Sequence, residues 1–137
     1  MKPKRAGFTM LELMVVVVIM GVLATMAIPK AGKTVENTRV DQAAAELHSI
    51  WGAQRRYRMQ HQDFAPDLKT LVDGGYLQKA LLEKKEPFQF AVQATRSGGL
   101  RMTATRTGSG WSGELVLDEM GDLKGSVRNG GGDEVKP

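Results

Sequence analysis

A stretch of 21 residues from Phe8 to Ile28 contains one charged side chain, that of Glu12, and it constrains the fold more than any other feature. An α-helix rises about 1.5 Å per residue, so a helix of this length spans roughly 30 Å, the thickness of a bilayer's hydrocarbon core. The β-branched run from Val15 to Ile19 slightly disfavours helix in water. In lipid, however, only a helix satisfies its own backbone hydrogen bonds. The stretch therefore predicts a membrane-spanning helix.

A basic leader precedes this stretch and supplies three charges, those of Lys2, Lys4 and Arg5. By the positive-inside rule, these charges keep the amino terminus in the cytoplasm and place the rest of the chain outside. A cleavable signal peptide and a plain signal anchor are the competing interpretations. The small-residue cleavage site that a signal peptide needs is poor around Ala24–Ala27. Neither alternative accounts for Glu12, because a lone carboxylate in hydrocarbon is costly and usually has a functional partner. Glu12 also lies close enough to one end of the span to snorkel to water.

Composition limits the remaining functions. The formal net charge is +4, but it falls to +1 without residues 1–7, so we do not expect a nucleic-acid partner. The chain has no cysteine, which excludes disulfide frameworks and thiol nucleophiles. With 137 residues, it has room for one soluble domain beyond the apolar stretch.

Helical periodicity continues from Thr34 to about Gln60. Apolar or core-forming residues recur there at spacings of three and four, which predicts one buried stripe: Val40, Ala43, Leu47, Ile50, Gln54 and Tyr57, widened by Ala44 and Trp51. Charged residues mark the side expected to face solvent: Glu36, Arg39, Asp41, Glu46, Arg55 and Arg56.

The carboxyl-terminal half changes its pattern. Pro66 interrupts the helix, and Leu68, Leu71 and Val72 predict a short helical segment closed by Gly74 and Gly75. After Pro87 apolar residues alternate with polar ones, and glycine-rich turns separate three or four such runs. This pattern predicts an antiparallel meander with one apolar face, which packs on the helical stripe.

The sequence offers no catalytic or metal site that we would assign. His48 and His61 have no carboxylate or cysteine at ligand spacing. Asp118, Glu119 and Asp122 fit a polar turn better than a calcium loop, because the regular loop spacing is absent. The cluster of Arg55, Arg56 and Arg58 fits a solvated helix end better than a DNA contact. We therefore expect a protein that is not an enzyme and that has no cofactor and no metal.

The run Gly7-Phe8-Thr9-Met10-Leu11-Glu12, with a basic leader before it and an apolar helix after it, resembles the amino terminus of the type IV pilin superfamily. The resemblance implies that a prepilin peptidase cuts between Gly7 and Phe8 and methylates the new amino group of Phe8. It implies that Glu12 pairs with the Phe8 amine of a neighbouring subunit, since a close pair offsets the cost of two charges in an apolar core. Gly21 and Pro29 match the positions between which family helices kink or unwind.

The resemblance implies an α+β fold, in which a long amino-terminal helix packs by its second half against a small antiparallel sheet of three or four strands. The expected segments are a leader (1–7), a transmembrane and filament-core helix (8–29), an amphipathic helix (30–61), a connecting loop (62–87), a sheet (88–128) and a disordered tail (129–137).

The function implied is that of a structural subunit of a type IV pilus-like filament. The alternatives are a pseudopilin of type II secretion and a minor pilin whose head binds DNA or a surface. The chain lacks the cysteine pair of many major pilins and a clear Pro-Trp-Gly stretch before its first strand, while Glu12 argues against a tip-type pseudopilin. The implied partners are identical or homologous pilin subunits, the prepilin peptidase, an inner-membrane assembly platform and, before assembly, membrane lipid. The implied location is the bacterial inner membrane as a single-pass protein with a cytoplasmic amino terminus, followed by a periplasmic or extracellular filament.

Overall fold

One helix, α1 (Met10–His61), contributes to both compact units of the chain, which are Met1–Thr34 and Val35–Pro137. The computed structural model describes residues 7–84, 86–94, 99–108 and 110–137, with the backbone alone for residues 26–31. The predicted leader therefore lies outside the described residues except for Gly7.

In the first unit, α1 continues without interruption from Met10 through Gly21 and Pro29. Every side chain described there is exposed, including those of the long apolar run up to Thr25. Within the residues that the structure describes, no helix has both the length and the apolar character that a membrane crossing requires.

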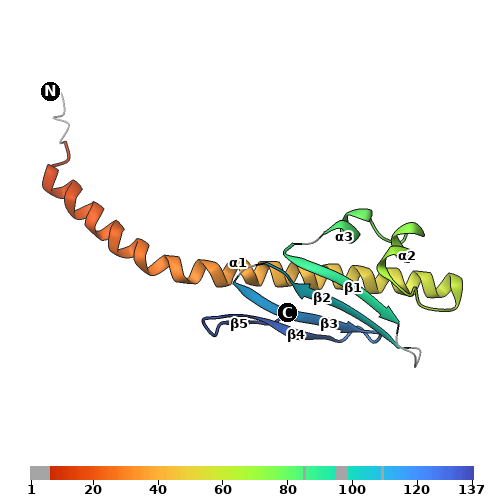
Figure 1. The fold of residues 1–137 in the computed structure, drawn as a ribbon. Coiled ribbons are helices and arrows are strands. Elements are labelled where there is room, and N and C mark those ends of the chain that lie inside the picture. Colours follow the sequence, from red (N-terminus) through yellow and green to blue (C-terminus); the bar gives the residue numbers. More distant parts are fainter. Residues whose placement is uncertain (1–6, 85, 95–98, 109) are drawn as a thin grey trace, which may run out of the picture. The chain divides into compact units, whose positions relative to one another are not determined.

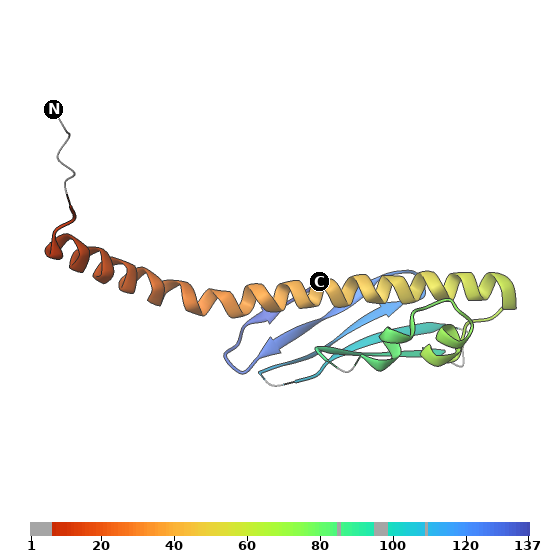
Figure 2. The same ribbon diagram turned by 90° about the horizontal axis from the view of Figure 1, so that it is seen from above.

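The second unit packs the remainder of α1 against an antiparallel sheet (Figure 1). The strands are β1 (Phe88–Ala94), β2 (Leu100–Arg106), β3 (Trp111–Asp118), β4 (Leu123–Asn129) and β5 (Glu134–Val135), and they pair in sequence order as a meander. Figure 2 shows the sheet on one side of this part of the helix. The α+β class and the packing of the sheet on the second half of the helix are confirmed.

The helical stripe and the apolar face of the sheet form one core. Val40, Leu47 and Ile50 of α1 are fully buried together with Met102 and Leu115 of the sheet. The predicted stripe is thus confirmed at its centre. Its polar member also belongs there: the side-chain amide of buried Gln54 accepts from the Ala65 N–H (2.9 Å) and donates to the Ala65 carbonyl (3.0 Å).

The prediction that Glu36 faces solvent is wrong. This side chain is only 1% exposed, because it lies one helical turn before Val40 on the buried face of α1. A charge is tolerated there because the guanidinium of Arg106, at the end of β2, meets it. Helical spacing alone did not reveal a partner seventy residues away along the chain.

The carboxyl-terminal tail also departs from the prediction. We expected disorder over residues 129–137 and a sheet of three or four strands, whereas the described residues form a sheet of five. The fifth strand, β5, pairs with β4 and buries Val135. A turn held by Asn129, whose side-chain oxygen accepts from the N–H groups of Gly131 and Asp133, brings it back to the sheet. The glycines and charges that suggested disorder therefore form a hairpin.

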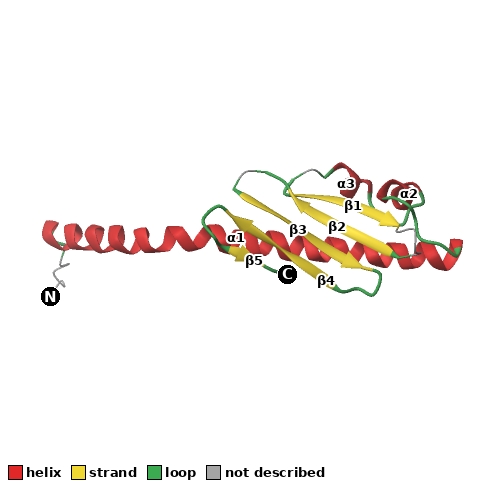
Figure 3. Cartoon of the chain, turned by 60° about the horizontal axis from the view of Figure 1, so that its bottom comes forward, coloured by secondary structure: helices red, strands yellow, loops and turns green. Residues whose placement is uncertain are grey.

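The connection between α1 and the sheet contains α2 (Leu68–Asp73), where the pattern predicted a short helix, and α3 (Lys79–Glu83), which it did not predict. Asp67 caps α2, and its carboxylate accepts from the backbone N–H of Thr70 at 2.7 Å. Figure 3 shows both short helices beside the β1 end of the sheet.

Two glycines allow β3 and β4 to approach closely. Gly113 and Gly125 have φ angles of 150° and 120°, a region that side chains rarely adopt. A Cβ on Gly113 would collide with the backbone of Ser126, and one on Gly125 would collide with the backbone of Glu114. The pairing of these strands therefore requires glycine at both positions.

Candidate functional site

The amino-terminal segment begins with three residues outside the helix. Gly7, Phe8 and Thr9 have no regular structure, and the side chain of Phe8 is 81% exposed. Apart from its chain neighbours, no described atom lies within 4 Å of the position that a Cβ on Gly7 would occupy. A side chain at this position would therefore meet no other described part of the fold.

Thr9 caps α1. Its hydroxyl oxygen accepts from the Glu12 N–H at 3.2 Å, and its carbonyl accepts from the Leu13 N–H at 3.1 Å. An N-cap residue satisfies one of the otherwise unpaired N–H groups of the first turn. Threonine followed by glutamate three residues later is the sequence pattern of a capping box.

The Glu12 carboxylate is exposed in the first turn of α1. Within the described part of the chain, no ion pair or side-chain hydrogen bond engages it. An acid at this end of a helix interacts favourably with the helix dipole. Phe8 and Glu12 are thus four residues apart in the sequence, and no hydrogen bond or ion pair between them is found among the described residues.

The side chains that follow form an apolar surface. Large residues from Met10 to Leu23 are between 44% and 85% exposed. Soluble monomers rarely expose apolar patches of this extent, and those that exist usually mark a protein or membrane interface. This surface is the feature of the molecule best suited to binding.

Gly21 lies inside this helical segment, and apart from its chain neighbours and the backbone of its own helix, a Cβ on it would meet no described atom within 4 Å. Glycine costs a helix interior about 1 kcal/mol relative to alanine. Pro29 lies in the same helix and lacks the N–H that would bond one turn back. The contacts of the described residues give no reason for glycine at position 21.

The sequence analysis did not predict a largely buried ion cluster in the second unit. Glu36 accepts from Arg106 through both carboxylate oxygens, at 2.5 Å (Nε) and 3.2 Å (Nη2), and from Arg39 at 3.2 Å. Arg106 also donates to the carbonyl of Pro87 at 3.2 Å. The period-two pattern of β2 contained a signal for it, because Arg106 has the same parity as inward-facing Met102.

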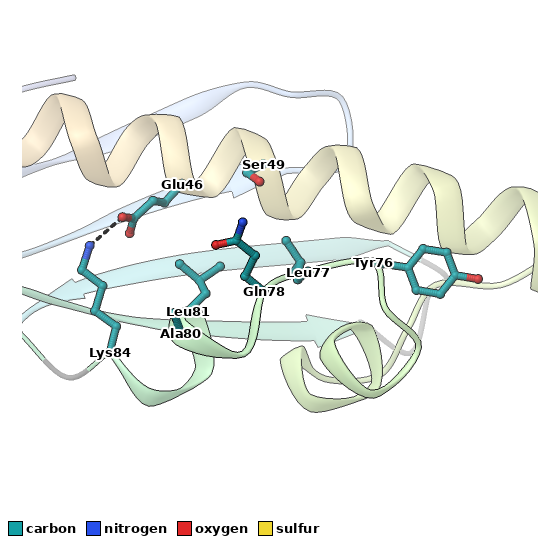
Figure 4. Close-up of a pocket in the computed structure, with 8 residues that line it drawn as sticks. All are labelled: Glu46, Ser49, Tyr76, Leu77, Gln78, Ala80, Leu81 and Lys84. Atoms are coloured by element: carbon teal, nitrogen blue, oxygen red, sulfur yellow. Dashed lines mark hydrogen bonds and ion pairs between the residues drawn. The ribbon is translucent and has the colours of Figure 1, made fainter.

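The connecting segment and α1 enclose a groove of about 490 Å³ in the second unit (Figure 4). Lys84 reaches across it to Glu46, with 2.6 Å between Nζ and Oε1. The other carboxylate oxygen of Glu46 is buried and has no hydrogen-bond partner among the described residues. Leu77 and Leu81 supply the apolar wall. The ion pair between Lys84 and Glu46 joins the connecting segment to α1 across this groove.

The three arginines of the basic cluster, Arg55, Arg56 and Arg58, each contact a neighbouring part of the second unit. The guanidinium of Arg55 lies over the ring of Trp51 at 4.8 Å, and that of Arg58 over Phe64 at 4.6 Å. Arg56 donates to the carbonyl of Tyr76 at 3.0 Å. Each arginine thus has a role in packing the end of α1.

Acidic residues of the second unit shape turns. Asp118 accepts from the N–H groups of Met120 and Asp122, as a polar turn requires. The pKa of the Asp67 carboxyl is lowered mainly by the hydrogen bond from the backbone N–H of Thr70, with a smaller contribution from the Thr70 hydroxyl. No group of three or more potential metal ligands occurs among the residues that the structure describes.

Comparisons with known proteins give one match to the amino-terminal segment and longer matches that extend into the second unit. Residues 2–28 match the family model of the prokaryotic N-terminal methylation motif. A fimbrial protein of Pseudomonas aeruginosa is 29% identical over 116 residues, which cover 80% of this chain and 75% of the relative.

Two further relatives match shorter regions. The type IV major pilin protein PilA of Myxococcus xanthus is 35% identical over 53% of this chain and 34% of its own length. The type II secretion system core protein G of Aeromonas hydrophila is 27% identical over 57% of this chain and 66% of its own length. The comparison with solved structures found no match.

Proposed function

Because the chain belongs to the superfamily of type IV pilins and type II secretion pseudopilins, we propose that it is a structural subunit of a pilus-like filament. One observation carries the proposal: the apolar surface of α1 from Met10 to Leu23 is covered by nothing in its own chain that the structure describes. A row of identical helices would bury that surface. In this proposal the protein has a structural role in the filament and no enzymatic one.

The proposal includes a membrane stage. The apolar run from Phe8 to Ile28 lies in the inner membrane as a single span, with the leader in the cytoplasm. A prepilin peptidase cuts between Gly7 and Phe8 and methylates the Phe8 amine. Glycine at position 7 suits this step, because a residue without a Cβ lets the peptidase approach the backbone closely.

Glu12 has the assembly role in this proposal. Its exposed carboxylate pairs with the Phe8 amine of a neighbouring subunit once both lie among apolar helices. Pairing offsets much of the desolvation cost that either charge would carry alone. Gly21 and Pro29 weaken α1 between them, which allows the helix to kink or unwind during passage from lipid to filament. An inner-membrane assembly platform would receive the processed subunit.

A pilus is the first candidate and a type II secretion pseudopilus the second. The Pseudomonas fimbrial protein aligns with 80% of this chain, and the type II secretion core proteins G of Pseudomonas aeruginosa and Aeromonas hydrophila align with 68% and 57%. The pilus is placed first because the fimbrial alignment covers somewhat more of the chain. A minor pilin whose head binds DNA or a surface has no such support, because the arginines of the basic cluster pack locally.

The test combines the mature mass with one substitution. The protein from cells should begin at Phe8 and carry one methyl group, and Glu12→Ala should insert into the membrane but fail to enter filaments. Asp41→Ala removes an exposed acid from the same helix within the second unit, so it is the matched control and should assemble normally. Filaments of Glu12→Ala at normal yield would contradict the pairing role, and a mature start after Met26 or Ala27 would contradict the class.

A further inference from the structure

The hydroxyl of Thr9 ends α1 two residues after the proposed cleavage site. The Gly7–Phe8 peptide lies outside the helix, Thr9 is the N-cap, and Met10 is the first helical residue. A peptide bond inside a helix has its N–H and C=O groups engaged within the helix and its faces covered by neighbouring turns. A protease that binds an extended segment must first unwind such a bond.

Gly7 competes with Thr9 for the capping position. Glycine caps helices about as well as threonine, and phenylalanine between them is not a favoured cap. If Gly7 became the cap, Phe8 would become the first helical residue and the Gly7 carbonyl would accept the first hydrogen bond of the helix. The cleavage site would then belong to the first turn.

We propose that Thr9 is a positioning residue for processing: its hydroxyl fixes the start of α1 at Met10 and so holds the Gly7–Phe8 bond extended for the peptidase. This inference rests on the proposed function. Two observations support it, namely the cap hydrogen bond from the Glu12 N–H to the Thr9 hydroxyl and the start of α1 at Met10. Together they leave the Gly7–Phe8 peptide outside the helix.

The experiment measures cleavage of the full chain in membrane vesicles that contain the prepilin peptidase. Cleaved protein is quantified by mass as a fraction of the inserted precursor. Thr9→Ala should slow the appearance of the Phe8 terminus about three-fold. A typical loss of a threonine cap shifts the equilibrium about five-fold, and if Gly7 and Thr9 cap about equally well, the fraction of chains with the bond outside the helix falls from about one half to about one sixth. Thr9→Ser keeps the capping hydroxyl and should be cleaved at the wild-type rate.

Two further variants separate helix position from other effects. Thr25→Ala is the matched control, because this exposed threonine bonds within the helix to the Val22 carbonyl (2.7 Å) and caps nothing; its cleavage should be normal. In Thr9→Ala/Met10→Pro, proline favours the first helical position and keeps the preceding residue extended. This double variant should recover the wild-type rate without any hydroxyl at position 9.

The outcomes are distinct. Equal rates for Thr9→Ala and wild type would overturn the inference. Failure of the proline variant to recover would overturn it as well, since the peptidase would then contact the hydroxyl itself. If the wild-type chain is not cleaved between Gly7 and Phe8 at all, the proposed function fails and not the capping argument alone.

Discussion

The two parts of α1 have the same backbone structure and opposite surroundings. From Met10 to Thr34 every described side chain is exposed, whereas from Val35 to His61 a stripe that includes Val40 and Leu47 is fully buried. In the second part, packing against the sheet stabilises the helix, as it does in most globular proteins. In the first part nothing described in the chain takes that place. An apolar helix without an internal partner needs an external one, and lipid or other subunits supply it in the proposed function.

The acids near the start of each part repeat the contrast. Glu36 is buried, and Arg106 and Arg39 neutralise it within the chain. Glu12 is exposed, and no described residue pairs with its carboxylate. The buried acid of the second unit is therefore neutralised within the chain, while the exposed carboxylate of Glu12 has no such partner among the described residues.

The largest expected effect comes from removing the internal partner of Glu36. Arg106→Ala would leave the carboxylate of Glu36 buried and short of its main partner, which should lower the free energy of unfolding by about 3–5 kcal/mol. Denaturant unfolding of the full chain in detergent measures it, with fluorescence as the signal because Trp51 and Trp111 both lie in the second unit.

Two variants frame this result. Arg101→Ala removes an exposed arginine from the same strand and should change stability by no more than about 0.5 kcal/mol. Glu36→Leu/Arg106→Met replaces the pair by apolar groups and should recover most of the loss. If Arg106→Ala were as stable as wild type, Glu36 would not depend on its internal partner and the contrast with Glu12 would disappear.

A pair of truncations along α1 should give the next largest difference. Leu47→Ala removes a fully buried side chain and should destabilise the head by about 2–5 kcal/mol. Val17→Ala removes a side chain that is 60% exposed and should change unfolding of the head by less than about 0.5 kcal/mol. The same denaturation experiment compares them. Equal effects would show that the first part of α1 contributes to the stability of the head.

Local patterns predicted much of this architecture. Periodicity identified the stripe with Leu47 at its centre, alternation identified the inward faces of the strands, and Pro66 marked the end of α1 within a few residues. Each of these signals depends on neighbours in sequence, which fix secondary structure and which face is apolar. The residues of the proposed site came instead from the resemblance to type IV pilins, which the contiguous motif from Gly7 to Glu12 carries, and their roles stay predictions.

The sequence analysis did not predict features that depend on residues far apart in the chain. Glu36 looked like part of the solvated face until Arg106 supplied a buried partner from another element. Residues 129–137 looked disordered because pairing with β4, and not local composition, orders β5. The hydrogen bond from the Trp51 ring nitrogen to the Glu119 carbonyl (3.0 Å) spans sixty-eight positions and has no local signature. The cap by Thr9 is different, since Thr9 and Glu12 carry a capping-box pattern that the sequence alone displays.

The smallest expected effect concerns how the tail is held, an exposed counterpart of the buried pair at Glu36. Arg128 donates to Glu134 at 2.8 Å (Nη2) and 3.1 Å (Nε), and this hydrogen bonding is the main cause that lowers the pKa of Glu134 from 4.5 to about 2. Since the folded-state pKa is the lower one, the stabilisation is present above pH 4.5 and is lost as the pH falls towards 2.

In an NMR titration, Arg128→Ala should therefore raise the pKa of Glu134 towards 4.5. Lys136→Ala removes a weaker contact at 3.6 Å and should raise it less. If Glu134 titrated near 4.5 in the wild-type protein, pairing with Arg128 would not contribute to docking of β5, and backbone bonds together with burial of Val135 would hold the tail alone.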